Sequence, residues 1–338
     1  MQTSLTTAME FNTAQEVERI TAFMKDTLRS KLKKRGLIIA ISGGVDSGVC
    51  AALCVEAIGK NKVFGLLLPE TDSSSESLIR GKQLAEHLGI DYAIENIAPA
   101  LEAVGCYKWR DAAIKSIFPD YDGTWKNKIT IAGGQAGQFN HFNLVVQRPE
   151  GEVLEARMGL KEYLQIVAAT NNKQRIRKSI EYFHADRLNY AVVGTPNRLE
   201  FDQGFFVKNG DGSADIKPIA HLYKTQVYAL AKHLGIPTEI ATAVPTTDTY
   251  SMSQGQDEFY FALPYDKMDV ALWAYNNKIS IPELAKYLSL TNERAKYIFD
   301  DIKSKRLATH YLHSKPYLVD NTVLHELEAT IQLRSSQE

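Results

Sequence analysis

Ser42 to Ser47 is the stretch of this sequence that points most directly to chemistry, because it holds two hydroxyls, two glycines and a carboxylate. It follows an apolar run, Leu37 to Ile41, that is typical of a strand buried on both faces, and it precedes a helical pattern. The N–H groups that open a helix have no partners within it, so together with the two serines they could bind phosphate oxygens. Asp46 would repel a phosphate unless a cation lay between them. The combination therefore predicts Mg²⁺ with a polyphosphate.

Better-known phosphate loops do not match this stretch. Gly43 and Gly48 have the spacing of a Walker loop, but Val49 stands where that loop requires a lysine. A G-x-G-x-x-G dinucleotide fingerprint is also missing here. A corner that needed glycine only for packing would not need two hydroxyls and an acid. The remaining pattern, S-G-G-V-D-S after a strand, resembles the PP-loop of the N-type ATP pyrophosphatases, which split ATP between its α- and β-phosphates.

Strands and helices alternate along the first 200 residues, and they must position this loop. Apolar periodicity predicts strands at 37–41, 63–68, 92–97 and 190–193, and helices at 12–33, 76–87 and 161–187. The short links between them predict an α/β fold: a doubly wound, Rossmann-like parallel sheet with helices on both faces. In such a sheet the ligand binds at the carboxyl ends of the strands.

Two segments depart from this alternation. Residues 105–165 form a long excursion with a local strand at 142–146, of the kind that serves as a lid, a binding loop or an oligomer contact. Residues 257–338 are predicted to be a helical C-terminal extension packed on the same domain. We therefore expect an ATP-pyrophosphatase α/β domain over 1–256, with an insertion at about 105–165.

Composition narrows the class of protein. The 338 residues include 39 Lys+Arg and 40 Asp+Glu, so the net charge of −1 gives no sign of a nucleic-acid-binding surface. No window has eighteen uninterrupted apolar residues, and the first residues lack a signal-peptide pattern. Three cysteines cannot form a complete disulfide framework. We expect a cytoplasmic protein that binds neither nucleic acid nor membrane.

Seven motifs in order along the chain together resemble the NAD⁺ synthetase family in its ammonia-dependent form. They are S-G-G-V-D-S at 42–47, N-x-K-x-R-x-R-x-x-x-x-Y at 171–182, V-V-G-T-x-x-x-x-E at 192–200, G-F-F-x-K-x-G-D-G-x-A-D at 204–215, L-x-K-x-Q at 222–226, P-T-x-D at 245–248 and D-E…L-P-Y-x-x-x-D at 257–269. The first motif is shared by many ATP pyrophosphatases, whereas the block at 204–215 with P-T-x-D is far more specific.

The resemblance implies an adenylating amide ligase. The nicotinate carboxylate of deamido-NAD⁺ would attack the α-phosphorus of ATP and release pyrophosphate, and ammonia would then displace AMP to give NAD⁺. Such a reaction needs cations and N–H donors around the phosphates.

Roles for individual residues follow from the same resemblance. It implies Mg²⁺ ligands at Asp46 and Glu200, and catalytic roles for Asp46, Lys224 and Asp215. It implies ATP-binding roles for Ser42, Gly43, Gly44, Ser47, Thr195, Lys224 and Thr246. For the acid substrate it implies Asn171, Arg175, Lys208, Asp211 and Asp215, of which the first two share a helical stripe with Lys178 and Tyr182. An aspartate there could help to deprotonate ammonium.

Partners are also implied by the resemblance: ATP, deamido-NAD⁺ and ammonia, and a second copy of the chain in a homodimer. The glutamine-dependent enzymes carry an added nitrilase-like domain, which neither the first 36 residues nor the tail could hold. We therefore expect free ammonia as the nitrogen donor, or a separate glutaminase subunit.

Three other readings remain. Pro196, Arg198 and Leu199 replace residues usual in the family, so a related ligase that amidates a different carboxylic acid is the first alternative. A tRNA-modifying PP-loop enzyme would need a catalytic cysteine pair and a basic RNA-binding domain, and the net charge and cysteine positions disfavour it. A non-catalytic nucleotide-binding protein is disfavoured because both expected Mg²⁺ carboxylates are present.

Overall fold

Four parallel strands form the central sheet of the computed structural model, which describes residues 5–132, 141–243, 250–252, 260, 263–320 and 322. The strand order is β3-β2-β1-β7, with β1 at Leu37–Ala40, β2 at Val63–Leu67, β3 at Asp91–Ile94 and β7 at Ala191–Val193. Strand β1 pairs with β2 on one side and with β7 on the other. The chain thus winds outward from β1 in both directions, and this reversal opens a crevice at the carboxyl ends of β1 and β7.

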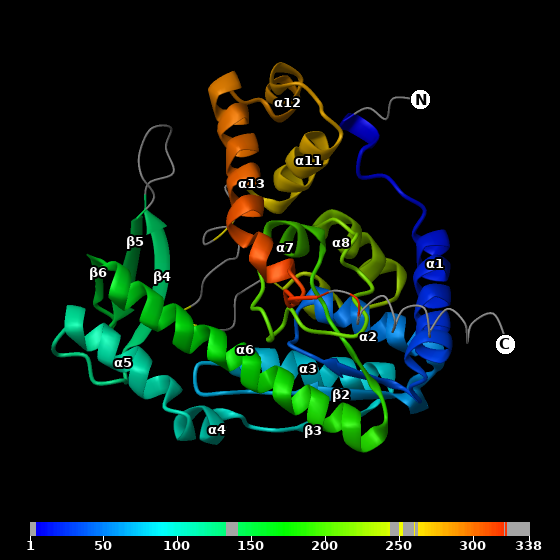
Figure 1. The fold of residues 1–338 in the computed structure, drawn as a ribbon, viewed down its shortest axis with the longest axis horizontal. Coiled ribbons are helices and arrows are strands. Elements are labelled where there is room, and N and C mark those ends of the chain that lie inside the picture. Colours follow the sequence, from blue (N-terminus) through cyan, green and yellow to red (C-terminus); the bar gives the residue numbers. More distant parts are fainter. Residues whose placement is uncertain are drawn as a thin grey trace.

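Helices cover both faces of this sheet, as predicted (Figure 1). Leu37 and Ile39 of β1 point into one core, which is covered by α1, α2, α3 and α8, while Ile38 points into the opposite core beneath α4, α5 and α6. This alternation is what a strand buried on both faces requires. The helix bounds are α1 Thr13–Asp26, α2 Val45–Ile58, α3 Ser75–Leu88, α4 Ala98–Ala103, α5 Cys106–Ile117, α6 Leu160–Leu188, α7 Arg198–Gln203, α8 Lys224–His233 and α9 Thr238–Ala241.

The excursion contains a second, antiparallel sheet. Strands β4 (Lys126–Ala132), β5 (His141–Gln147) and β6 (Val153–Arg157) pair in the order β4-β5-β6. The sequence indicated only the middle strand, because polar residues alternate on the outer two. Leu144 and Ile129 pack in a core with Ile114 of α5 and Ile166 of α6. This sheet therefore rests on the same long helix that covers the parallel sheet.

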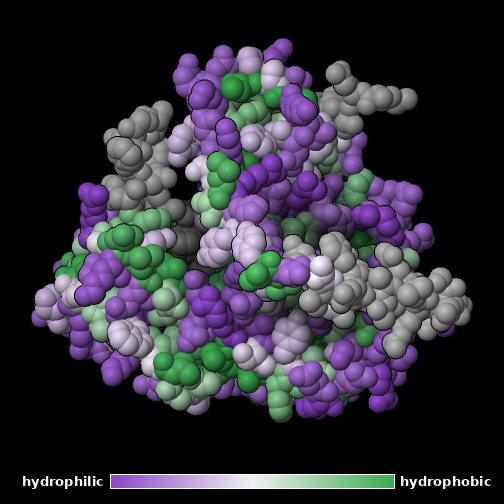
Figure 2. All heavy atoms as spheres, viewed as in Figure 1, coloured by the Kyte–Doolittle hydropathy of each residue, from purple (hydrophilic) through white to green (hydrophobic). Residues whose placement is uncertain are grey.

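A block of three helices forms the C-terminal region and has a core of its own. These are α11 (Tyr265–Asn276), α12 (Ile281–Leu288) and α13 (Asn292–His313). Leu199 of α7 and Tyr223 before α8 contribute to this core, so the block packs directly on the α/β domain. None of the described helices has the length and apolar character needed to cross a membrane. On the face shown in Figure 2 most residues are hydrophilic, and apolar ones gather toward the side of α5 and α6.

Candidate active site

The loop between β1 and α2 has the geometry of an anion cradle. Gly43 has φ +80°, and a Cβ there would lie 2.5 Å from the carbonyl oxygen of Ser77, so only glycine fits. Gly44 begins α2 as its N-cap and has no side chain to cover the first N–H groups. The hydroxyls of Ser42 and Ser47 are 3.0 Å apart, and Ser47 also donates to the carbonyl of Gly44 at 3.0 Å. Hydroxyls and helix N–H groups therefore converge on one spot.

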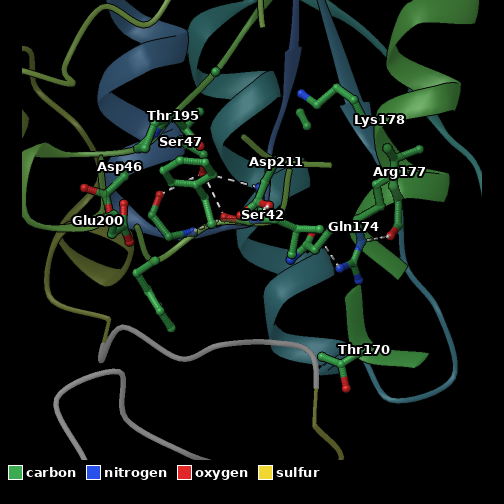
Figure 3. Close-up of a pocket in the computed structure, with 18 of the residues that line it drawn as sticks. Ser42, Asp46, Ser47, Thr170, Gln174, Arg177, Lys178, Thr195, Glu200 and Asp211 are labelled. Carbon is green, nitrogen blue, oxygen red and sulfur yellow. Dashed lines mark hydrogen bonds between the residues drawn. The ribbon is translucent and has the colours of Figure 1, made fainter. Parts of the chain in front are cut away.

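An acidic pair lies beside this cradle (Figure 3). Asp46 is on the first turn of α2, and Glu200 is on α7 after β7. Asn197 connects them: its side-chain amide donates to Asp46 at 3.4 Å, and its backbone N–H donates to Glu200 at 3.0 Å. Burial and the nearby Asp46 raise the pKa of Glu200 to about 8. Two carboxylates held together in this way repel each other when ionised, so the site favours a cation.

Lys224 supplies the positive charge that the pair needs. Its ammonium group is fully buried and bonds to the carboxylate of Asp46. Burial alone would lower the pKa of Lys224, but Asp46 and Glu200 outweigh that effect and raise it. Asp269 of α11 fixes this residue, because its carboxylate accepts from the backbone N–H of Lys224 at 3.2 Å and of Thr225 at 2.8 Å. Burial raises the pKa of Asp269 to about 6.

Helix α6 forms the opposite wall, with Gln174, Arg177 and Lys178 across from the acidic pair in Figure 3. The predicted Asn171 and Arg175 line the same wall. Arg175 donates to the carbonyl of Lys208 at 3.3 Å, which ties the helix to the loop at 204–215.

The loop at 204–215 closes this side of the cavity. The ammonium group of Lys208 donates to the carbonyls of Tyr311 at 2.7 Å and Ser314 at 3.0 Å, at the end of α13. Asp211 accepts from the backbone N–H of Val207 at 2.7 Å, and burial raises its pKa.

These parts enclose one cavity of about 640 Å³, a size common for small-molecule sites. Most predicted site residues meet there: Ser42, Gly43, Gly44, Asp46, Ser47, Asn171, Arg175, Thr195, Glu200, Lys208, Asp211 and Lys224. Aromatic rings line it too, including Phe142, which stacks on Tyr163 with ring centroids 4.0 Å apart. The excursion therefore contributes directly to the cavity wall.

Among the described residues, one predicted residue does not join this group. Asp215 is exposed and lies outside the cavity lining; its carboxylate accepts from the backbone N–H of Val192 at 2.7 Å and from the Tyr182 hydroxyl at 3.3 Å. Thr246 lies outside the described residues. The roles assigned to both stay predictions.

Sequence reasoning missed Asn197 and Asp269 as functional residues. Asn197 precedes a helix and follows a core strand, which is the signal of a helix cap that also faces a ligand edge. Asp269 ends one of the motifs but carried no role. Lys173 has no role in the sequence analysis beyond its place in the motif at 171–182, yet it is buried and bonded to Glu70 and Asp72.

The acidic pair fits the Mg²⁺ that the sequence predicts. Within the described ranges no group of three or more His, Cys, Asp or Glu side chains is arranged to hold a metal. Mg²⁺ commonly binds through one or two carboxylates and substrate phosphates, with water completing its shell. Asp46 and Glu200, next to a phosphate cradle, offer that donor set.

Comparisons with known proteins point to one family. A family model described as NAD synthase matches residues 16–117 and 148–310. A protein of Rhizobium meliloti (strain 1021) named NH(3)-dependent NAD(+) synthetase is 55% identical over 312 residues, which covers 92% of this chain and 93% of that protein. One of the same name from Rhizobium rhizogenes is 52% identical over 313 residues, covering 92% and 94%. Among solved structures, NMN synthetase from Francisella tularensis has a TM-score of 0.64 at 21% identity, covering 92% of this chain and all of that one, and so shares the fold.

Proposed function

The chain belongs to the NAD synthase family, and on that premise we propose that it is an ammonia-dependent NAD⁺ synthetase. The observation that carries the proposal is the convergence of the phosphate cradle, the acidic pair and Lys224 at one end of the cavity, opposite a polar wall from α6. The fold and the family both agree with a ligase that uses ATP.

The reaction has two steps. A carboxylate oxygen of deamido-NAD⁺ attacks the α-phosphorus of ATP, the bond to the β-phosphate oxygen breaks, and pyrophosphate leaves. Ammonia then attacks the acyl carbon, AMP departs with the electron pair of the acyl–oxygen bond, and a proton is lost from nitrogen to leave the amide.

Residues of the cradle would serve the first step. Ser42, Ser47 and the N–H groups at the start of α2 would bind the phosphate oxygens. Lys224 would stabilise the negative charge that develops on the departing pyrophosphate. Thr195 lines the same end of the cavity. Thr246 remains a predicted phosphate contact. When bound, Mg²⁺ held by Asp46 and Glu200 would neutralise phosphate charge.

Residues of the opposite wall would serve the acid and the nitrogen. Asn171 and Arg175 would position the acid substrate, with Lys208 holding the loop in place through the end of α13. Asp211 is the better-placed proton acceptor for ammonium, because it lines the cavity and its raised pKa makes it a stronger base. Asp215 would hold the loop in place through its bonds to Tyr182 and to the backbone of β7.

A homodimer is part of the proposal. Trp109 on α5 and Leu160 and Leu164 on α6 are exposed, and these two helices pack against each other. Neighbouring exposed apolar residues are typical of a protein interface. Sedimentation of the full chain tests this, with a dimer as the expected result.

The substrate is tested by product formation. The full chain is incubated with ATP, Mg²⁺, ammonium and one acid at a time, deamido-NAD⁺ first and nicotinate mononucleotide second, and AMP and pyrophosphate are measured. We expect AMP and NAD⁺ in equal amounts with deamido-NAD⁺. AMP formed only with the mononucleotide would support the related ligase, and ADP with orthophosphate would contradict both.

A further inference from the structure

A second cavity, of about 560 Å³, lies beside α7 and is distinct from the first. Arg198, Phe201 and Asp202 of α7 face it, at positions i, i+3 and i+4, so they share one side of the helix. Glu200 of the same helix faces the first cavity. The short helix therefore separates two cavities and contributes charged residues to both.

The walls of this second cavity carry an excess of positive charge. Its charged residues are Arg19, Arg198, Lys217 and Asp202; His221 and His313 also line it, and burial lowers the pKa of His313. The one acid among them is already neutralised, because Arg306 donates to both oxygens of Asp202 at 2.6 Å. The carboxylate of Glu16 is hydrogen-bonded to both Arg19, at 2.5 Å, and His221, at 2.6 Å. Positive charge enclosed in this way raises the local concentration of anions.

The side chain of Arg198 gives the strongest indication that this cavity binds an anion. Its guanidinium lies over the ring of Tyr223, 5.4 Å from the centroid. Its Nε atom is buried and has no hydrogen-bond partner in the part of the chain that the structure describes. A buried donor left without an acceptor lowers the stability of the folded protein. A turn of the guanidinium toward the cavity, which Arg198 lines, would let a ligand oxygen accept from this group.

Lys217 lines the same cavity, and its ammonium group is already bonded within the protein. Its ammonium group donates to the carbonyl of Gly212 at 2.6 Å and lies 4.8 Å from the ring centroid of Phe201. Burial and the charge of Lys178 lower the pKa of Lys217. An anion beside it would stabilise its charged form.

We propose that this second cavity binds a phosphate group, free or carried by a nucleotide, with Arg198 and Lys217 as its donors. The planar fork of a guanidinium matches the oxygens of phosphate, and a lysine adds a point charge. Phe201 and Phe23 on the same walls offer apolar surface for the remainder of a nucleotide. The proposal does not depend on the function proposed above, since it rests on residues outside the first cavity.

The residues that would bind this anion are neighbours, in sequence or by contact, of residues around the acidic pair. Arg198 directly follows Asn197, whose side chain donates to Asp46. Phe201 stacks on Phe206, which lines the first cavity, with ring centroids 6.1 Å apart. An anion bound in the second cavity could therefore change the positions of the residues that contact Asp46 and Glu200.

The test is a calorimetric titration of the full chain with inorganic pyrophosphate, inorganic phosphate and AMP, each separately. We expect two classes of pyrophosphate site. Lys224→Met should remove the class in the first cavity, and Arg198→Gln should weaken the other by about tenfold or more, the loss expected for a charge-assisted hydrogen bond. Lys217→Met provides a second variant should Arg198→Gln fail to fold. Arg294→Gln is the matched control, because Arg294 also lies over a tyrosine ring, that of Tyr297, at 5.0 Å.

The outcomes separate the sources of the phosphate. AMP binding as tightly as phosphate at the Arg198-dependent site would identify a phosphate borne by a nucleotide, and tighter binding of the inorganic anions would identify free phosphate. One class of site for every probe, unchanged by Arg198→Gln and Lys217→Met, would overturn the proposal.

Discussion

Two groups of charged residues lie at the carboxyl ends of neighbouring strands, and they differ in how completely their charges are paired. We call Asp46, Asn197, Glu200 and Lys224 the β1-end cluster, and Glu70, Asp72, Lys173 and Arg110 the β2-end cluster. In the β2-end cluster, Lys173 bonds to Glu70 at 3.0 Å and Asp72 at 2.5 Å, and Arg110 bonds to Asp72 at 2.5 Å. In the β1-end cluster, one lysine bonds to Asp46 while Glu200 keeps a pKa of about 8.

Access to the cavity accounts for the difference. The side chains of Lys173 and Glu70 are 1% and 0% exposed, so this pair is sealed between α6 and the loop after β2. The side chain of Asp46 is 18% exposed and lines the cavity. A sealed and paired cluster holds elements together, whereas an open cluster with surplus acid can exchange its partners for a cation or a phosphate. Burial of charge alone therefore does not identify a catalytic site.

The largest expected effect is on activity, at the β1-end cluster. Asp46→Asn and Lys224→Met should each lower the rate of AMP formation by about 10²-fold or more, because each removes charge stabilisation around the phosphates. Exchange of labelled pyrophosphate into ATP, with the acid present, measures the first step directly. Retained exchange in Asp46→Asn would show that this carboxylate does not serve adenylation.

The β2-end cluster should respond in the opposite way. Lys173→Met leaves two buried carboxylates without their ammonium partner, and breaking a buried ion pair costs about 3–5 kcal/mol of the free energy of unfolding. Urea denaturation measures this loss, and pyrophosphate exchange by the folded fraction should change by less than about tenfold. The comparison fails if Lys173→Met is as stable as the wild type but inactive.

The sequence was sufficient for Asp46, Glu200 and Lys224 of the β1-end cluster, but not for Asn197 or for the β2-end cluster. Ser42 to Ser47 follows an apolar strand, so its glycines and acid signal a ligand edge, and the doubly wound parallel sheet follows from the alternation of strands and helices. Lys173 pairs with Glu70 and Asp72, which lie about a hundred residues away. Such pairing depends on tertiary packing that helical periodicity does not contain. For the same reason the outer strands of the antiparallel sheet gave no clear apolar pattern: side chains of β6 alternate between exposed and half-buried, and β4 buries the polar Asn127 beside Ile129.

The pH dependence of stability should sharpen the contrast. Glu200 has a folded pKa of about 8 against an ordinary value of 4.5, so between these values the folded protein holds a proton that the unfolded chain releases. The free energy of unfolding should then fall as pH rises through that window, by a few kcal/mol at most. Asp269 has a pKa of about 6 against an ordinary value of 3.8, so it lowers the free energy of unfolding in the same way, but between these lower pH values. The test is therefore urea unfolding between pH 6 and 8 without Mg²⁺.

Glu200→Gln should flatten this fall, because glutamine has no proton to lose. Mg²⁺ with ATP should also reduce it in the wild type, since a cation bound by the acidic pair replaces the proton. A fall that persists unchanged in Glu200→Gln would show that another group holds the proton.

A contrast within a single loop distinguishes the two aspartates at 204–215, and it includes the smallest expected effect, that of Asp215→Asn. Asp211 lines the cavity, so Asp211→Asn should slow amide formation by about 10²-fold, the size of a general-base contribution, while pyrophosphate exchange continues. Asp215 accepts from the backbone of β7 and lies outside the cavity lining, so Asp215→Asn should cost about 1 kcal/mol of stability through a weakened hydrogen bond and change the rate of amide formation by less than about threefold. Raising the ammonium concentration should not rescue Asp211→Asn, because its defect is in proton removal. If Asp215→Asn instead loses amide formation at full stability, the proton acceptor lies on the Tyr182 side of the loop, and the cavity described here must extend there when substrate binds.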